Sequence, residues 1–153
     1  LLAVERINRR LDAVEAFYAD PIVRGDTRDA LRGVADVERL MARISTGTAN
    51  ARDLVALRAS LERVPEVAAR AATVENEAVQ ALCAELDGLP EISGLLARAV
   101  VDEPPISLRD GNLIKDGFDA ELVELRALSR GGKDWIAQLE TEQREATGIK
   151  SLK

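Results

Sequence analysis

Apolar residues recur every three or four positions along most of the chain, which is the spacing that places them on one face of an α-helix. The first such stripe predicts a helix over 3–19. A stripe of this kind is expected to pack against other helices. Its members are Val4, Ile7, Leu11, Val14 and Tyr18.

Further helices are separated by residues that start or stop a helix. Asp20 is followed by Pro21, and this pair favours a helix start, because aspartate caps free amides and proline is tolerated in the first turn. Asn50 is expected to cap another helix, with Leu54, Leu57, Leu61 and Val64 on its inner face. Pro65 is expected to restart a short helix rather than continue that one. The remaining helices are predicted over 21–31, 35–46, 75–86 and 90–100.

Short connections between these helices favour antiparallel neighbours, so the predicted fold class is all-α, an irregular multi-helix bundle. Pro104 and Pro105 end this region, because proline cannot continue a helix. Asp110-Gly111 then predicts a small hairpin or turn. The predicted division is a helical core over 1–105, followed by a turn and a long helix over 106–153.

The last helix is predicted over 119–146, about 42 Å long at 1.5 Å per residue. We expect its first half to pack on the body and its last turns to protrude, before a new extended segment over 148–153. Gly131 and Gly132 suit either the close approach of another helix or a bend, and close approach is the preferred interpretation. The candidate structural residues along this helix are Phe118, Leu122, Leu125, Gly131, Gly132, Ile136 and Leu139.

The charge and composition exclude several classes of protein. The formal net charge is −6, so the basic patch of a dedicated DNA-binding module is not expected. No run of about 18 apolar residues predicts a membrane span. The single cysteine, Cys83, excludes an internal disulfide framework and fits a reducing cytoplasm.

Candidate catalytic groups are few. The chain has no histidine, which removes the commonest general base and metal ligand. Cys83 is interpreted as a structural cysteine, and Trp135 as a packing residue. The carboxylates of Asp102-Glu103, Asp116 and Asp119 are explained by helix capping and solvation. No catalytic, cofactor or metal site is therefore predicted.

Short motifs follow one another in order along the whole chain. The amino-terminal ones are Ile7-Asn8-Arg9-Arg10-Leu11-Asp12-Ala13-Val14-Glu15, Asp36-Val37-Glu38-Arg39-Leu40 and Ala49-Asn50-Ala51-Arg52-Asp53-Leu54-Val55-Ala56-Leu57. The later ones are Asp102-Glu103-Pro104-Pro105, Arg109-Asp110-Gly111, Ile114-Lys115-Asp116-Gly117-Phe118-Asp119 and Thr147-Gly148-Ile149-Lys150-Ser151-Leu152-Lys153. This collinear series resembles the bacterial MutS family of DNA mismatch repair proteins.

The resemblance implies that the chain is most of a central helical core and the lever helix leading into a DNA clamp. It implies a parent protein that binds mismatched duplex DNA, hydrolyses ATP with Mg²⁺, forms a homodimer and is cytoplasmic and nucleoid-associated. The partners of this piece would be the connector, clamp and ATPase domains, with no cofactor of its own and no membrane. Its departures from the family pattern are Phe118, where tyrosine is common, and the double glycine Gly131-Gly132.

Two other functions remain open. An autonomous helical adaptor would bind a partner helix along the stripe over 118–139, and an unrecognised small enzyme is a more remote alternative. A mechanical role in the parent is the preferred interpretation, because a long helix turns a small rotation at its base into a larger displacement at its tip.

Overall fold

The computed structural model of the protein describes residues 3–148, apart from the side chains of Lys133 and Asp134. This described part contains no strand, so the predicted all-α fold class is confirmed. The chain divides into two compact units, with the division between Ile114 and Lys115. The extended segment expected after Gly148 lies outside the described residues. The helices are α1 (Val4–Ala19), α2 (Pro21–Leu31), α3 (Val37–Ser45), α4 (Ala51–Ala71), α5 (Glu77–Glu85), α6 (Pro90–Ala99), the 3-10 helix η1 (Leu108–Asp110) and α7 (Ala120–Thr147).

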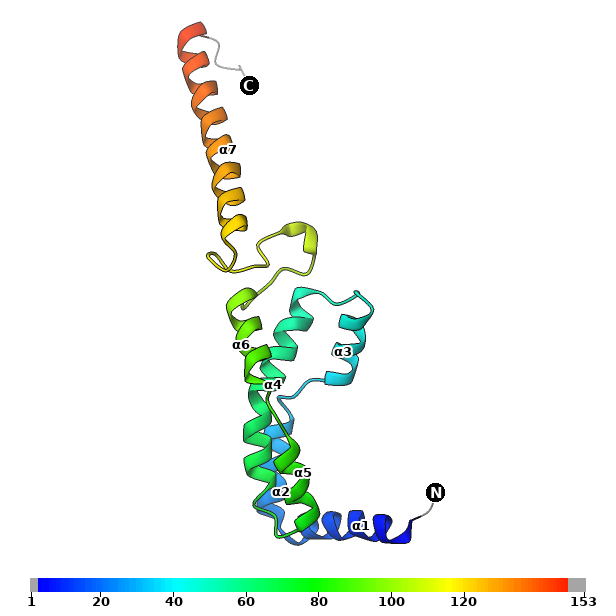
Figure 1. Cartoon of the computed structure of the whole chain (residues 1–153). Helices are drawn as coiled ribbons and strands as arrows, with labels where there is room; N and C mark the ends of the chain where they lie inside the picture. Colours follow the sequence, from blue (N-terminus) through cyan, green and yellow to red (C-terminus); the bar gives the residue numbers. More distant parts are fainter. Residues whose placement is uncertain (1–2, 149–153) are drawn as a thin grey trace. The chain divides into compact units, whose positions relative to one another are not determined.

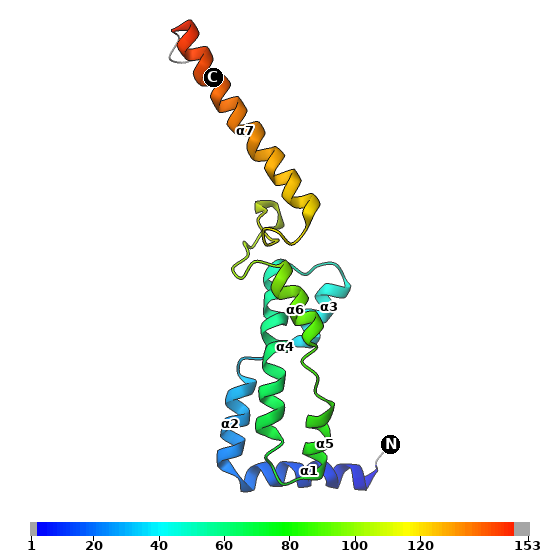
Figure 2. The same cartoon turned by 60° about the vertical axis from the view of Figure 1, so that its left-hand side comes forward.

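Helix α4 is the central helix of the first unit. Helices α2, α3, α5 and α6 all pack along it, and α1 lies across its carboxyl-terminal end (Figures 1 and 2). One buried cluster joins Leu40 of α3 to Leu57 and Leu61 of α4. A second joins Ala51, at the start of α4, to Val100, directly after α6. The core of the first unit is therefore a series of contacts spread along α4.

Capping side chains set the starts of α2 and α4 as the sequence predicted. Asp20 Oδ1 accepts hydrogen bonds from the backbone N–H groups of Ile22 (3.1 Å) and Val23 (2.9 Å) at the start of α2. Asn50 caps α4 in the same way. These side chains satisfy amides that have no partner inside the helix.

Helix α1 packs through a different face from the one that its apolar stripe predicted. Ala13, Ala16 and Phe17 contact the buried cluster around Val74. The predicted stripe from Val4 to Tyr18 is between 44% and 79% exposed at its five positions. The prediction that this stripe packs on other helices was wrong for the described residues, because α1 contacts α2 and α5 through the face that carries Ala13, Ala16 and Phe17.

Pro65 lies inside α4 instead of starting a new helix, so that prediction was wrong. Proline has no N–H, and the carbonyl of Leu61 therefore lacks its usual donor. Gly88 passes this point so closely that an added Cβ would lie 2.9 Å from the Leu61 oxygen and 3.1 Å from Cδ of Pro65. Helix α4 continues because burial of Leu61 before the proline and Ala71 after it offsets the lost bond.

The sequence predicted a small hairpin or a turn between α6 and α7, and the structure shows a turn. It contains the single 3-10 turn η1, which ends at Gly111 with a φ of 67°, a value that glycine tolerates readily. An isolated antiparallel bridge pairs Ile114 with Val100. The residues after Gly111 thus return to the end of α6 and do not pair with the residues just before Asp110.

The second unit is dominated by α7, which has 28 residues and is therefore about 42 Å long. Asp119 Oδ1 accepts from the backbone N–H of Leu122 at 2.8 Å and caps its start. Gly148 ends it in the left-handed conformation, with a φ of 70°. The predicted helix over 119–146 agrees with these limits to within one residue at each end.

Candidate functional site

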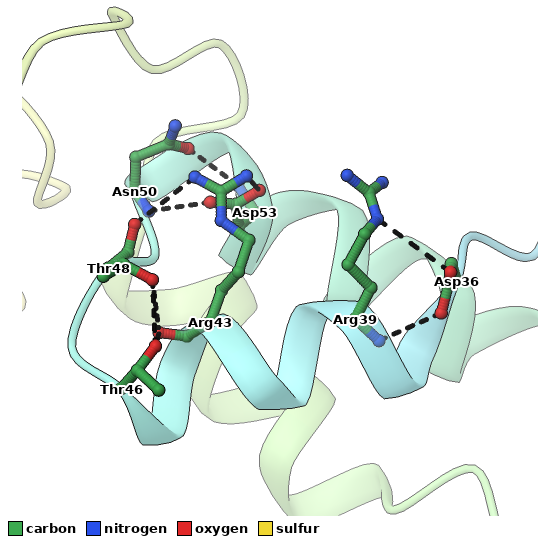
Figure 3. A network of polar contacts seen from close by, with 7 residues as sticks. All are labelled: Asp36, Arg39, Arg43, Thr46, Thr48, Asn50 and Asp53. Carbon is green, nitrogen blue, oxygen red and sulfur yellow. Dashed lines mark hydrogen bonds and ion pairs between the residues drawn. The ribbon is translucent and has the colours of Figure 1, made fainter.

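Arg43 joins the end of α3 to the start of α4 (Figure 3). Its Nη1 donates to Asp53 Oδ1 at 3.0 Å, and its Nη2 donates to the carbonyl of Thr48 at 3.3 Å. The Asp53 side chain is 12% exposed. The ion pair is therefore partly shielded from water, which makes it stronger than a pair on the open surface.

The same carboxylate completes the cap of α4. Asp53 Oδ2 accepts from the backbone N–H of Asn50 at 2.8 Å, while Asn50 Oδ1 accepts from the backbone N–H of Asp53 at 3.0 Å. This reciprocal arrangement is a capping box. Asp53 thus holds the helix start with one oxygen and Arg43 with the other.

The loop between α3 and α4 is closed by its own hydrogen bonds (Figure 3). The carbonyl of Arg43 accepts from the backbone N–H groups of Thr48 (2.9 Å) and Ala49 (3.1 Å). The hydroxyls of Thr46 and Thr48 lie 2.9 Å apart. Gly47 between them has a φ of 68°, which permits the tight reversal. The connection is therefore ordered by local bonds as well as by the ion pair.

A second polar contact ties the segment after α6 to α4. Arg58 Nη1 lies 2.8 Å from Asp102 Oδ1, and Arg52 Nε donates to the carbonyl of Pro104 at 3.0 Å. The Arg58 side chain is only 14% exposed. Pro104 is buried, so this segment is held by apolar as well as polar contacts.

A third contact is formed by Ser60, which is 1% exposed in the middle of α4. Its hydroxyl donates to the carbonyl of Ala56 at 2.7 Å and accepts from the backbone N–H of Ala35 at 3.0 Å. Ala35 belongs to the connection between α2 and α3. We call these three contacts, centred on Arg43, Arg58 and Ser60, the α4 joints. Each fixes a neighbouring element to the central helix.

The described residues offer structural roles for the groups that could carry chemistry. They contain no set of three or more His, Cys, Asp or Glu residues placed to hold a metal ion. Asp102 pairs with Arg58, Asp119 caps α7, and Asp116 pairs with Arg126. Cys83 is half-buried and packs against the cluster around Val79.

The candidate residues of the last helix lie along α7, apart from Phe118, which precedes it. Leu122 is half-buried, whereas Phe118, Leu125, Ile136 and Leu139 are exposed. A Cβ added at Gly131 or Gly132 would meet no atom within 4 Å. Trp135 is 64% exposed. Among the described residues of this unit, the packing neighbours expected for the glycines and for Trp135 are therefore not present.

Sequence reasoning missed the α4 joints. The spacing Asn50-x-x-Asp53 was a readable signal, since a residue that caps a helix and an acid three positions later form a capping box. Nothing local marked Arg43 or Arg58, because their partners lie 10 and 44 positions further along the chain.

In the described part of the chain, no helix combines the length and the apolar character needed to cross a membrane.

Comparison with known proteins identifies the family. The family described as MutS domain III matches residues 1–152. The DNA mismatch repair protein MutS of Geobacillus kaustophilus is 48% identical over 153 residues, which is 100% of this chain and 17% of that protein. Those of Methanosarcina mazei and Brevibacillus brevis are 46% and 48% identical, again over 100% of this chain and over 17% and 18% of their own lengths. The chain spans less than a fifth of these relatives, and it belongs to the MutS domain III family.

Proposed function

We propose that this chain is the helical core and lever of a longer DNA mismatch repair protein, in which it transmits movement between an ATPase domain and a DNA clamp. The observation that carries the proposal is the family match over residues 1–152. Relatives identical at nearly half of the positions are named DNA mismatch repair protein MutS. On this proposal the parent binds mismatched duplex DNA, acts as a homodimer in the cytoplasm and contacts this piece through its connector, clamp and ATPase domains.

The chemistry of the parent is assigned to residues outside this chain. The 153 residues contain no histidine and no Gly-x-x-x-x-Gly-Lys-Ser/Thr loop that would hold ATP and Mg²⁺. Their net charge of −6 is unfavourable for binding DNA phosphates. This piece is therefore proposed to be mechanical, with neither catalysis nor mismatch reading of its own.

Two stiff elements suit such a role. Helix α4 has 21 residues, and the α4 joints attach neighbouring elements to it, so a push on one of these elements moves α4 with it. Helix α7 is a single uninterrupted helix of 28 residues. Coupling also requires that two states of the parent place these rods differently. Long helices with few internal breaks would transmit such a difference in position over tens of ångströms.

A proline in α7 tests the rigid-lever proposal. In the full-length parent, Ala137→Pro should break or kink the helix at a cost of about 3 kcal/mol. We expect ATP-triggered release of a fluorescent G·T mismatch duplex to slow by roughly tenfold or more, while basal ATP hydrolysis stays within about twofold. Ala137→Ser, which keeps the helix, is the matched control. Unchanged release in the proline variant would overturn the lever proposal.

A binding assay tests the proposal that DNA binding and mismatch reading belong to other domains of the parent. Fluorescence anisotropy of labelled duplexes, with and without a G·T mismatch, is measured against the 153-residue chain at low salt. We expect no binding at high micromolar protein. Salt-sensitive binding that ignores the mismatch would place a phosphate-contacting surface on this piece. Mismatch-selective binding would contradict the assignment of mismatch reading to other domains.

The alternative function is an autonomous adaptor that binds a partner helix, and the exposed apolar side chains of α7 favour it. Leu125 is 56% exposed and Ile136 is 54% exposed. Gene context separates the two proposals. A core domain predicts that the reading frame continues into a clamp and later a phosphate loop, whereas an adaptor predicts a stop soon after Lys153.

A further inference from the structure

The turn at the end of η1 contains an aspartate directly before a glycine, Asp110-Gly111. We propose that this pair is a site of spontaneous covalent modification, at which the aspartate converts to isoaspartate as the protein ages. The modification lengthens the main chain in the segment that connects α6 to α7. The proposal goes beyond the proposed function and does not depend on it.

The reaction needs only these two residues and water. The Gly111 backbone nitrogen attacks Cγ of the protonated Asp110 carboxyl group, and the carboxyl hydroxyl leaves with the amide proton as water, which closes a five-membered succinimide ring. A second water then adds to the Asp110 backbone carbonyl carbon and breaks its bond to the nitrogen, so the main chain now runs through Cγ. One water is released and one is consumed. Glycine in the second position favours ring closure, because it has no side chain to obstruct the approach of its nitrogen.

The chain offers its own comparison, because Asp-Gly occurs at three places, 87–88, 110–111 and 116–117. At the first of these, Asp87 Oδ1 accepts a hydrogen bond from the backbone N–H of Leu89 at 2.9 Å. A Cβ added at Gly88 would lie 2.9 Å from the Leu61 carbonyl oxygen, so the glycine is closely packed. The carboxylate and the glycine of this pair are therefore both held, and ring closure would have to break these contacts.

The pair at 116–117 is held through its acid alone. Asp116 forms an ion pair with Arg126 of α7. Gly117 has a φ of 83° and open space around it, so its surroundings resemble those of Gly111. The two pairs therefore differ in the carboxylate, because that of Asp116 must leave Arg126 before it can react.

The Asp110 carboxylate is unrestrained by comparison. It is exposed, and it forms no hydrogen bond or ion pair with another described residue. A side chain in water changes rotamer readily. The carboxyl group of Asp110 can therefore reach the nitrogen of the following residue without losing a partner.

The Gly111 nitrogen is also weakly held. Its N–H donates to the carbonyl of Leu108 at 3.4 Å, which is longer than the usual range for such a bond. A Cβ added at Gly111 would meet no atom within 4 Å, so the residue can rotate without moving a packed neighbour. Of the three Asp-Gly pairs, Asp110-Gly111 therefore has the fewest contacts to break before the ring closes.

Two backbone contacts lie just beyond the modified position and determine its effect on the fold. The N–H of Val101 donates to the carbonyl of Leu113 at 3.0 Å, and Ile114 forms the isolated bridge with Val100. Isoaspartate adds one methylene, about 1.5 Å of bonded chain, between η1 and these contacts. We therefore expect the modification to weaken the bond between Val101 and Leu113, which holds the returning segment to the end of α6.

Ring closure at each pair is measured in the full-length protein, aged at physiological temperature in mildly acidic buffer made with heavy-oxygen water. Each opening of a succinimide inserts one heavy oxygen atom, and peptide mass spectrometry after digestion in ordinary water assigns it to one of the three pairs. The same protein unfolded in guanidinium chloride gives the intrinsic rate of each pair. Relative to that rate, we expect 110–111 to slow by no more than about threefold and 87–88 by about tenfold or more. The pair at 116–117 should lie between them, because an exposed ion pair protects only weakly.

Two variants whose side chain is longer by one methylene serve as matched controls. Asp110→Glu keeps the charge but would need a six-membered ring, so incorporation of heavy oxygen at this position should largely disappear. Asp116→Glu makes the same change at the ion-paired site and should leave incorporation at 110 unchanged.

Amide hydrogen exchange measures the effect on the fold. In the modified fraction of aged protein, the N–H of Val101 should exchange at least about threefold faster than in fresh protein, and aged Asp110→Glu should show no such change. Protection of 110–111 as strong as that of 87–88 would overturn the proposal, as would unchanged Val101 exchange in protein that carries isoaspartate at 110. Failure of the lever proposal would appear in release of the mismatch duplex and would leave these rates unchanged, so the two can fail separately.

Discussion

The two longest helices, α4 and α7, differ in how far other elements bury them. Helix α4 has 21 residues, five of which are buried by helices on several sides. Helix α7 has 28 residues, and none of its described side chains is buried. The first is held mainly by tertiary contacts, and the second by interactions within its own length.

Each helix contains residues that disfavour helices, and their surroundings differ. Pro65 in α4 has an exposed side chain, but Gly88 lies close to it and Leu61, one turn earlier, is buried. Gly131 and Gly132 in α7 have open space around them. The ends and turns of α7 are supported locally, by the Asp119 cap and by pairs such as Arg144 with Glu140 at 3.1 Å. Packing can therefore overcome a helix breaker, whereas an isolated helix depends on its own caps and pairs.

The same leucine truncation in both helices should give the largest contrast. Leu57→Ala removes a side chain that is 6% exposed in α4 and should lower the free energy of unfolding by about 2–5 kcal/mol. Leu125→Ala in α7, where the side chain is 56% exposed, should change it by no more than about 0.5 kcal/mol. Urea unfolding followed by far-ultraviolet ellipticity measures both. Equal effects would mean that α7 is as tightly packed as α4.

Adding one methyl group should destabilise the protein at Gly88, where neighbouring atoms are close, and stabilise it at Gly25, where the space is open. Gly88→Ala sets a Cβ 2.9 Å from the Leu61 carbonyl and should destabilise the first unit by about 1–3 kcal/mol. Gly25→Ala in α2 meets no atom within 4 Å and should stabilise the chain by about 0.5–1 kcal/mol. Thermal unfolding of the two variants gives the signs directly. A stabilised Gly88→Ala variant would refute the close approach at Pro65.

The ion pair of Arg43 should contribute more to the free energy of unfolding than the exposed ion pair of Arg39, which lies in the same helix, α3. Arg43→Met leaves the largely buried Asp53 carboxylate without its cation and should lower the free energy of unfolding by about 1–2 kcal/mol. Arg39→Met is the matched control, since its pair with Asp36 is 3.9 Å long and exposed on both sides, and should lower it by under about 0.5 kcal/mol. Both are measured by urea unfolding. Similar losses of unfolding free energy in the two variants would mean that the Arg43–Asp53 pair contributes no more than an exposed ion pair.

The smallest expected effect concerns the local stability of α7. Gly131→Ala should raise the helix stability by about 0.5–1 kcal/mol, because alanine loses less backbone entropy than glycine and meets no atom there. Amide hydrogen exchange around position 131 should then slow by roughly two- to fivefold. Gly47→Ala, at a φ of 68°, is the opposite control and should destabilise its turn. Faster exchange in Gly131→Ala would show that the glycine serves a contact.

Local chemistry explains which structural features were predictable. The starts of α2, α4 and α7 follow from Asp20, Asn50 and Asp119, because a capping side chain bonds amides two or three residues away. The orientation of α1 was not predictable, since periodicity identifies an apolar face without identifying what covers it. The continuation of α4 through Pro65 and the pairing of Arg58 with Asp102 depend on residues far along the chain. The candidate residues of α7 remain predictions.

The single tryptophan of the chain, Trp135, gives the second unit an optical signal of its own. Its emission reports on α7 alone, while ellipticity sums over the helices of both units. Coincident transitions by two probes are the usual sign of a single cooperative unit. If the two probes give different midpoints here, the difference is evidence for two independently melting units rather than for a partly folded intermediate. A blue shift of the emission would report the moment at which another surface covers the indole.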